Sequence, residues 1–326
     1  MSKNNRLFKF FSAKPITKDD EFAEIPTNFK GFFVMLGRKF WNISNLSLLF
    51  SLANFPVFAI LLGFSMQDKH IVIDSPAFAE FFGVIGENMS SSAAEIFSSV
   101  SSFGVKTVPS TASWICFGIG ALLLITFGLS SAGAAYCIRG YNRGDPVFLI
   151  SDFFYTIKKN WKQALVVGIL DIFFIVVLIF DYMFWYSQPG FIEGILMYFA
   201  LFLCVLYFFM RYYIYTILIT FDLSIYKIFK DAFLLSFLGF KRNIVAFVGI
   251  LAVVFINFFI STVILSVGIM LPIILTFALC MFIAGYASYP VIQKYMIDPF
   301  YPDANDRNVD DDYESDDDEP VFEDRG

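Results

Sequence analysis

Histidine is almost absent from this sequence, and its cysteines show no regular spacing. His70 is the only histidine, which excludes a multi-histidine metal centre or a HExxH protease site. We interpret the four cysteines, which lie in or beside apolar runs, as small buried hydrophobic residues: Cys116, Cys137, Cys204 and Cys280. The sequence also lacks a Walker signature, a GxSxG motif and the carboxylate pair of a glycosidase. We therefore expect no enzymatic activity, no cofactor and no bound metal.

Charged residues are scarce, at 16% of 326 residues, whereas about a quarter is usual for a soluble domain. Apolar residues make up 58% of the chain, aromatic residues 20%, and phenylalanine alone occurs 44 times. Such a composition excludes a soluble domain, because too little polar surface is available to face water. It predicts an all-α, polytopic membrane protein.

About twenty consecutive apolar residues are needed for a helix to cross the hydrocarbon core of a bilayer. The predicted transmembrane helices are 43–66, 112–136, 164–185, 192–217, 244–267 and 270–292. The last two helices are separated by a turn near SVGIMLP, so five spans remain the alternative if that pair is re-entrant. The transmembrane domain is predicted over 43–293, with an outer loop at 67–111.

Lysine and arginine are distributed unevenly between the connections. Eight precede the first span, five lie in 137–163 and five in 211–243, whereas the opposite side has only Lys69 and Lys106. The positive-inside rule therefore places both termini in the cytoplasm. We expect a multi-pass protein of the plasma membrane.

The two ends of the chain differ from the apolar body. Residues 1–42 form a basic, aromatic segment without the apolar core of a secretory signal. Residues 294–326 form an acidic tail, in which 303–326 hold twelve Asp or Glu against two Arg, a net charge of −10. This tail lacks the apolar content needed to fold, and we expect it to be disordered.

Amphipathic helices are predicted on the cytoplasmic surface before the first, third and fifth spans. In the second of these, Asp145 and Pro146 are typical of a helix start, and apolar residues then recur at helical spacing. Their basic side chains are expected to face lipid phosphates: Arg38, Lys39, Arg139, Arg143, Lys158, Lys159, Lys162, Lys241 and Arg242. The pattern suggests three repeated units, each a surface helix and a transmembrane hairpin. Alternatively, any positive-inside entry into a membrane has this appearance.

Four polar residues within the spans are the candidate site residues. Asp171 lies about 10 Å inside the cytoplasmic end of the third span, and Arg211 lies at similar depth in the fourth. Because these spans form a hairpin, we expect the two charges to approach each other or to share a water molecule. Asn54 and Asn257 are expected to hydrogen-bond across helices. The charged pair either fixes helix register or, together with Asn257, lines a transport path.

Three stretches of the sequence resemble the YesL-like family of bacterial integral membrane proteins. They are FKGFFVMLGRKFWNISNLSLLFSLANFPVF, GLSSAGAAYCIRGYNRGDPVFLISDFFYTIKKNWKQALVVGILDIF and FDLSIYKIFKDAFLLSF. The resemblance extends over most of 29–290, but the 67–111 insertion and the acidic tail depart from the family pattern. It implies a protein without established activity that is often encoded beside carbohydrate uptake systems.

Two classes of function follow. The first is a non-enzymatic accessory or regulatory component associated with carbohydrate uptake. The alternative is a transporter of a small solute. The expected partners are the lipid bilayer and a carbohydrate transporter or membrane signalling protein. We expect no binding to nucleic acid.

Overall fold

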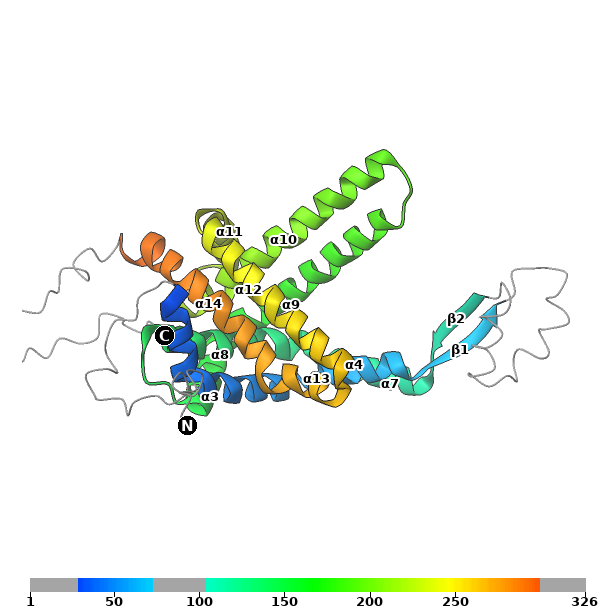
Figure 1. The fold of residues 1–326 in the computed structure, drawn as a ribbon, viewed down its shortest axis with the longest axis horizontal. Coiled ribbons are helices and arrows are strands. Elements are labelled where there is room, and N and C mark those ends of the chain that lie inside the picture. The colour runs from blue at the N-terminus through cyan, green and yellow to red at the C-terminus, as the bar shows by residue number, and fades with distance from the viewer. Residues whose placement is uncertain (1–28, 73–103, 300–326) are drawn as a thin grey trace, which may run out of the picture.

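The computed structural model describes residues 29–72 and 104–299, which form a helical bundle with one small strand pair (Figure 1). Its helices are α3 (Phe29–Ala53), α4 (Pro56–Ser65), α7 (Thr111–Gly120), α8 (Leu123–Arg143), α9 (Leu149–Tyr186), α10 (Phe191–Thr220), α11 (Ile225–Leu238), α12 (Phe240–Val263), α13 (Leu265–Leu271) and α14 (Phe277–Ile292). Two π-helical turns, η1 (Pro272–Thr276) and η2 (Gln293–Ile297), precede and follow α14. The strands are β1 (Gln67–Val72) and β2 (Gly104–Pro109).

The predicted all-α membrane architecture is confirmed. Within the described ranges, five helical stretches are long and apolar enough to cross a bilayer. They are Thr111–Arg143, Leu149–Tyr186, Phe191–Thr220, Phe240–Val263 and Leu265–Ile297. A sixth span is obtained if α3 and α4, which are bent by 61° relative to each other, form one broken span. We call the end of the bundle with β1, β2 and the α9–α10 turn the outer end, and the opposite end the inner end.

The first predicted span is interrupted rather than continuous. Pro56 begins α4 and has no N–H to donate to the carbonyl four residues earlier. The chain closes this break with irregular bonds, among them Phe55 N–H to the Leu52 carbonyl at 3.3 Å. The bend between α3 and α4 therefore follows from the proline.

The final hairpin turns earlier than the sequence predicts. The chain reverses at Ile264 (φ −136°, ψ 91°), whereas SVGIMLP lies in the helical segment α13 and η1. Pro272 cannot bond the Gly268 carbonyl, and the Asn257 side chain donates to that carbonyl instead at 3.3 Å. Since α12 and the stretch Leu265–Ile297 each have the length and apolarity of a span, the re-entrant alternative is not supported.

The predicted surface helix over 146–162 is the first part of α9, which contains a kink at Asn160 (φ −108°, ψ 15°). The helix begins at Leu149 and not after Asp145, so the predicted start is wrong. Asp152 provides the reason, because its carboxylate accepts the backbone N–H of Phe148 at 2.8 Å. Asp145 instead pairs with Arg143 at 3.2 Å.

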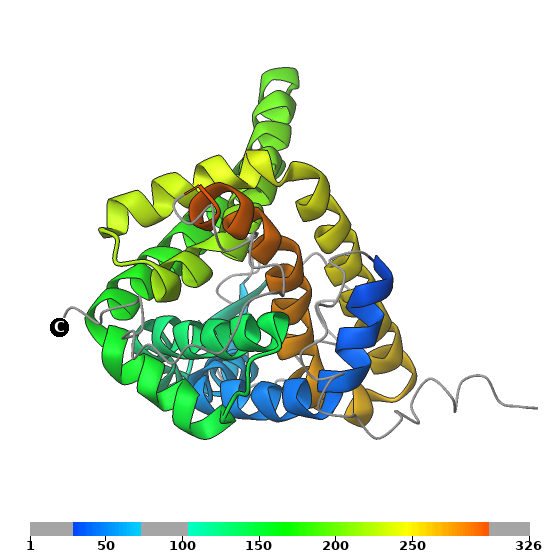
Figure 2. The ribbon, with the colours of Figure 1, turned by 90° about the vertical axis from the view of Figure 1, so that its left-hand side faces the viewer.

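Two of the predicted surface helices lie crosswise to the bundle. Figure 2, which looks at the inner end, shows α11 and the dark blue start of α3 lying across the long axis of the molecule. An amphipathic helix in this orientation is suited to the plane of a membrane surface. The threefold repeat stays a prediction.

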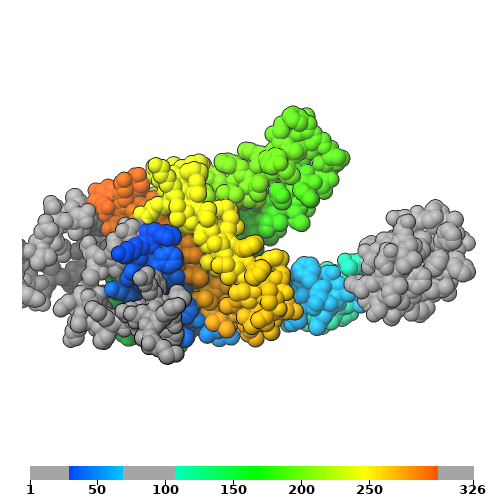
Figure 3. All heavy atoms as spheres, in the orientation of Figure 1, coloured from blue at the N-terminus to red at the C-terminus, as the bar shows by residue number. Residues whose placement is uncertain are grey.

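The packed core consists of two clusters, to both of which α8 contributes. The first cluster lies mainly among α8, α9, α10, α11, α12 and α14 and includes Tyr213, Ile214 and Ile217. The second lies among α3, α8, α14 and the start of α9 and includes Ile43, Phe153 and Phe282. By contrast, the outer part of the α9–α10 hairpin stands apart from α12 and α13 (Figures 1 and 3).

The ends of the outer connection form an antiparallel strand pair, which the sequence analysis did not anticipate. Gln67 pairs with Pro109, and Val72 pairs with Gly104. The rest of that connection lies outside the described residues, as do residues 1–28 and 300–326. Helical turn η2 continues the last span to Ile297, so the helix extends past the predicted tail boundary at 294.

Candidate functional site

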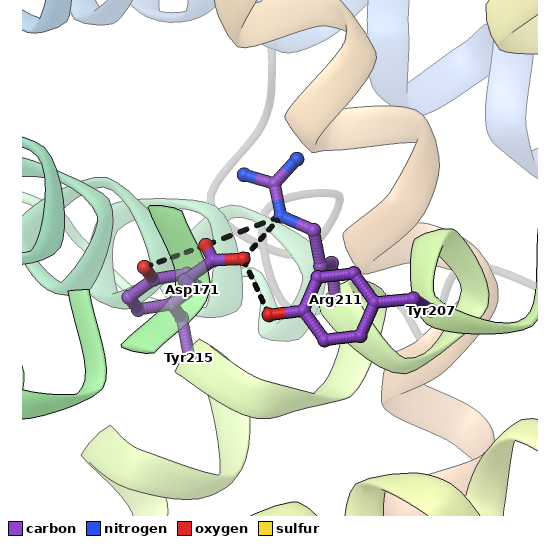
Figure 4. Close-up of polar contacts among 4 residues, drawn as sticks. All are labelled: Asp171, Tyr207, Arg211 and Tyr215. Atoms are coloured by element: carbon purple, nitrogen blue, oxygen red, sulfur yellow. Dashed lines mark hydrogen bonds and ion pairs between the residues drawn. The ribbon is translucent and has the colours of Figure 1, made fainter. Parts of the chain in front are cut away.

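The centre of the candidate site is the carboxylate of Asp171 on α9, which is fully buried. Three side chains of α10 surround it (Figure 4). The hydroxyl of Tyr207 donates to Oδ1 at 2.8 Å, and that of Tyr215 donates to Oδ2 at 2.9 Å. Nε of Arg211 lies 3.0 Å from Oδ1 and 3.2 Å from Oδ2. The two charges that were predicted to approach each other are therefore in direct contact.

Helical spacing explains how one helix supplies all three donors. Tyr207, Arg211 and Tyr215 follow one another at intervals of four, so they stand on one face of α10. The α9–α10 turn reverses the chain at Gly190, whose φ of 150° suits glycine. This hairpin brings that face of α10 against Asp171.

A contact between glycines positions α9 against α8. The backbones of Gly128 and Gly168 are in direct contact, and a Cβ atom on either residue would collide with the other helix. Asp171 lies three residues after Gly168 and therefore on the same side of α9. Because neither glycine has a Cβ atom, α8 can pack closely beside the Asp171 cluster.

A carboxylate at membrane depth is costly unless it is paired. Here a cation and two hydroxyl groups replace the water that Asp171 would bind in solution. Hydrogen bonds to a charged group typically stabilise by about 1.5–3 kcal/mol each, and an unpaired partner is strongly destabilising. The arrangement can therefore hold α9 and α10 in one register.

Arg211 is only partly enclosed by this cluster. Its side chain is 28% exposed, and its guanidinium carbon lies 5.5 Å from the ring centre of Phe127 on α8. Figure 4 shows the two terminal nitrogens pointing away from Asp171. Among residues 29–72 and 104–299, these nitrogens have no hydrogen-bond or ion-pair partner.

The two predicted asparagines do not join the Asp171 cluster. Asn54 donates across helices to the Ser130 hydroxyl at 2.7 Å and also to the Phe50 carbonyl at 2.9 Å. Asn257 bonds the Gly268 carbonyl near the outer end of α12. Both therefore connect helices, and Asn257 is not brought together with the charged pair.

The predicted basic residues have different environments. Arg38, Lys158, Lys159 and Lys241 are exposed, whereas Lys39 and Arg242 are half-buried. Nζ of Lys162 lies 5.7 Å from the ring centre of Trp161, and Arg143 pairs with Asp145. Arg139 differs from the rest, because it donates to the Thr220 hydroxyl at 2.9 Å and so links α8 to α10.

Several polar contacts were missed by reasoning from the sequence. The hydroxyls of Ser44, Ser47 and Ser51 on α3 donate to the carbonyls of Ile274, Pro272 and Ile273 at 2.9, 3.2 and 3.4 Å. We call these three residues the serine ladder. Tyr207 and Tyr215 were also missed, although their spacing of four from Arg211 could have placed them beside the same carboxylate.

The comparisons with known proteins find a similarity over part of the chain. The family model described as "Protein of unknown function, DUF624" matches residues 110–182. The matched segment includes α7, α8 and most of α9, with Gly128, Gly168 and Asp171. No curated protein and no solved structure matches the chain. The fold, together with this match, defines an integral membrane protein with similarity to a family of unknown function.

Proposed function

We propose that this protein is a non-enzymatic accessory or regulatory component of a bacterial plasma membrane, associated with carbohydrate uptake. The observation that carries the proposal is the enclosure of Asp171, whose oxygens accept from two tyrosines and an arginine while the side chain has no exposed surface. A charge used in this way fixes the arrangement of helices. The link to carbohydrate uptake comes from the resemblance to the YesL-like family.

Polar side chains elsewhere in the bundle also form hydrogen bonds between helices. The serine ladder joins α3 to η1, Asn54 joins the end of α3 to α8, and Tyr213 donates to Asn243 at 2.7 Å. Beyond Asp171, α9 is apolar from Ile172 to Phe180. This distribution supports a scaffold that acts through contacts more than a polar path across the bilayer.

The proposed orientation has both termini in the cytoplasm. Arg143, Lys158 and Lys241 lie at the inner end of the bundle, where α8 meets α9 and α11 meets α12. Lys69 and Lys106 lie in β1 and β2 at the outer end. The unequal distribution of basic residues between the two ends supports this orientation by the positive-inside rule.

Photo-crosslinking in native membranes tests the proposed role. A photoreactive residue at Phe180 on the outer α9–α10 hairpin, where the side chain is 70% exposed, is compared with one at Phe255 on α12, which is 68% exposed. We expect at least one position to capture a subunit of a carbohydrate transporter or a membrane signalling protein, identified by mass spectrometry. Lipid adducts alone at both positions would contradict the proposal.

A small-solute transporter is the second candidate, and the exposed edge of Arg211 favours it. Flux of labelled saccharides into reconstituted vesicles measures this activity directly. We expect no flux above that of protein-free vesicles. Flux that Asp171→Asn abolishes, with the variant still monodisperse, would replace the accessory role by transport.

A further inference from the structure

Arg211 lies where the two core clusters meet. Tyr207 and Tyr215, which share its face of α10, belong to the first cluster, whereas Phe127 packs against the second. The guanidinium carbon lies 5.5 Å from the Phe127 ring centre, so the side chain bridges these clusters. Its charged end is therefore directed into the bundle, between α8, α9 and α10.

The nitrogen atoms of the Arg211 guanidinium group differ in their hydrogen-bond partners. Nε contacts the Asp171 carboxylate, which fixes the plane of the guanidinium group. The terminal nitrogens point away from that carboxylate and have no partner within residues 29–72 and 104–299 (Figure 4). Unpartnered donors on a cation at membrane depth are costly, and the Arg211 side chain is 28% exposed and therefore not sealed by the helices around it.

An independent feature lies on the facing side of α8. The Ser131 side chain is 2% exposed, and its hydroxyl has no hydrogen-bond partner among the described residues. Ser131 follows Phe127 by four residues and therefore stands on the same face of α8, one turn closer to the inner end. Buried hydroxyl groups normally have a partner. An orphaned hydroxyl one turn from the Arg211 contact suggests a missing ligand.

We propose that Arg211 and Ser131 bind an oxyanion, a carboxylate or a phosphate group, between α8 and α10. The fork of terminal guanidinium nitrogens matches two oxygens of such a group, and the Ser131 hydroxyl donates to one of them. Asp171 is a positioning residue, because it holds Nε and leaves the opposite edge of the guanidinium group free. This site does not depend on whether the protein is a regulator or a transporter.

The ion pair with Asp171 also limits the affinity of the proposed site for an oxyanion. Since the pair carries no net charge, binding depends on directed hydrogen bonds, and we expect inorganic phosphate to bind with a Kd on the order of 1 mM. The site lies nine residues from the inner end of α10, about 14 Å along the helix. Either a free solute or a lipid headgroup drawn into the bundle has the required chemistry.

The test measures thermal unfolding of the full-length protein in a neutral detergent. Inorganic phosphate and acetate are titrated against chloride at equal ionic strength, with glucose as the uncharged probe. We expect phosphate or acetate to raise the unfolding temperature of the native protein. Ser131→Ala leaves the Asp171 contacts intact and is expected to weaken the apparent affinity about tenfold, the loss of one hydrogen bond to a charged group.

Arg211→Lys retains the positive charge but removes the fork, and it is expected to abolish the anion-dependent shift. Lys158→Gln, at an exposed position on the inner surface, is the matched control and should leave the shift unchanged. If Arg211→Lys does not fold, Ser131→Ala alone carries the test. A parallel titration with phosphatidylglycerol against diacylglycerol, which has no phosphate group, identifies the source, because a lipid headgroup would stabilise where free phosphate does not.

Three results would overturn the inference. One is the absence of any shift with phosphate, acetate or phosphatidylglycerol. Another is a shift that Lys158→Gln removes while Ser131→Ala and Arg211→Lys keep it, since the anion would then bind surface lysines. The third is stabilisation by glucose alone that requires Arg211. Each is distinguishable from failure of the proposed accessory role, which is read from crosslinked partners and not from anion binding.

Discussion

The inner and outer halves of the α9–α10 hairpin both contain many apolar residues, but their surroundings are very different. In the inner half, Ala164 and Val167 are completely buried, and Asp171 is enclosed by its partners. In the outer half, Phe180 is 70% exposed and Phe191 is 85% exposed. Apolarity alone therefore places these helices in a membrane, whereas the positions of glycine and of hydrogen-bonding groups determine where they pack.

The difference arises from the neighbours of each half. The inner half contacts α8 through Gly128 and Gly168, and α11 and α14 pack around α10. The outer half projects beyond these helices, and there α9 and α10 pack mainly against each other (Figure 1). Equivalent substitutions in the two halves should therefore have unequal effects on stability.

The largest effect is expected from Gly168→Leu. Its side chain would collide with the backbone of Gly128 and force α8 from α9, so we expect a loss of about 4 kcal/mol or more and little monodisperse protein. Val176→Leu, at a 59% exposed position of the outer half, is the control and should keep normal yield. Size-exclusion chromatography in detergent measures both. Equal yields would remove the distinction between the halves.

A large effect is also expected from Asp171→Asn. The substitution leaves Arg211 without its counter-ion, and breaking a buried pair typically costs about 3–5 kcal/mol. Asp181→Asn is the outer counterpart, because Asp181 is partly exposed and its one donor within the described part of the chain is the Trp185 ring nitrogen at 3.0 Å. Unfolding in mixed micelles of increasing SDS content gives the two free energies. A cost for Asp181→Asn as large as that for Asp171→Asn would contradict the comparison.

An intermediate effect is expected from Tyr215→Phe, which removes one hydroxyl from the buried carboxylate and keeps the ring. We expect a loss of about 1.5–3 kcal/mol in the same unfolding assay. Tyr198→Phe in the outer half, where the side chain is 68% exposed, should change the free energy of unfolding little. If the two tyrosines are equivalent, the Asp171 cluster does not stabilise the hairpin.

The smallest effect is expected from Ser47→Ala in the serine ladder. Hydrogen bonds between membrane helices contribute about 0.6 kcal/mol on average, and the unfolding free energy should fall by about that amount. Ser187→Ala provides the control, since its exposed hydroxyl bonds near neighbours in the chain: it donates to the Phe184 carbonyl and accepts from the Gln188 side chain at 3.5 Å. A loss above about 2 kcal/mol would show that Ser47 has a further role.

Much of the fold could be predicted from the sequence, because the requirements of a bilayer are simple. Long apolar runs indicated the membrane helices, and the hairpin between the third and fourth spans brought Asp171 to Arg211. The break at Pro56 could not be read as a 61° bend, since a proline in a span permits many angles. Likewise, the turn near SVGIMLP was misplaced because Asn257 supplies the bond that Pro272 cannot make.

Of the residues in the Asp171 cluster, only the two charged ones, Asp171 and Arg211, were predicted from the sequence. The energetic cost of an ionised residue in a span identifies Asp171 and Arg211. Tyrosines in an apolar run have many possible roles, so the spacing of Tyr207 and Tyr215 from Arg211 was their only signal. The free edge of Arg211 and the orphaned hydroxyl of Ser131 depend on how three helices pack. Such features require coordinates, because no spacing within one helix specifies them.

The serine ladder gives the contact between α3 and the last span a fixed alignment. Apolar surfaces in lipid can slide past each other with little change in energy, since one methyl group replaces another. The hydroxyls of Ser44, Ser47 and Ser51 instead meet the carbonyls of Ile274, Pro272 and Ile273, so sliding either helix along the other would stretch or exchange all three bonds together. Sliding at this contact is thus opposed by three directed hydrogen bonds in addition to the packing of apolar side chains.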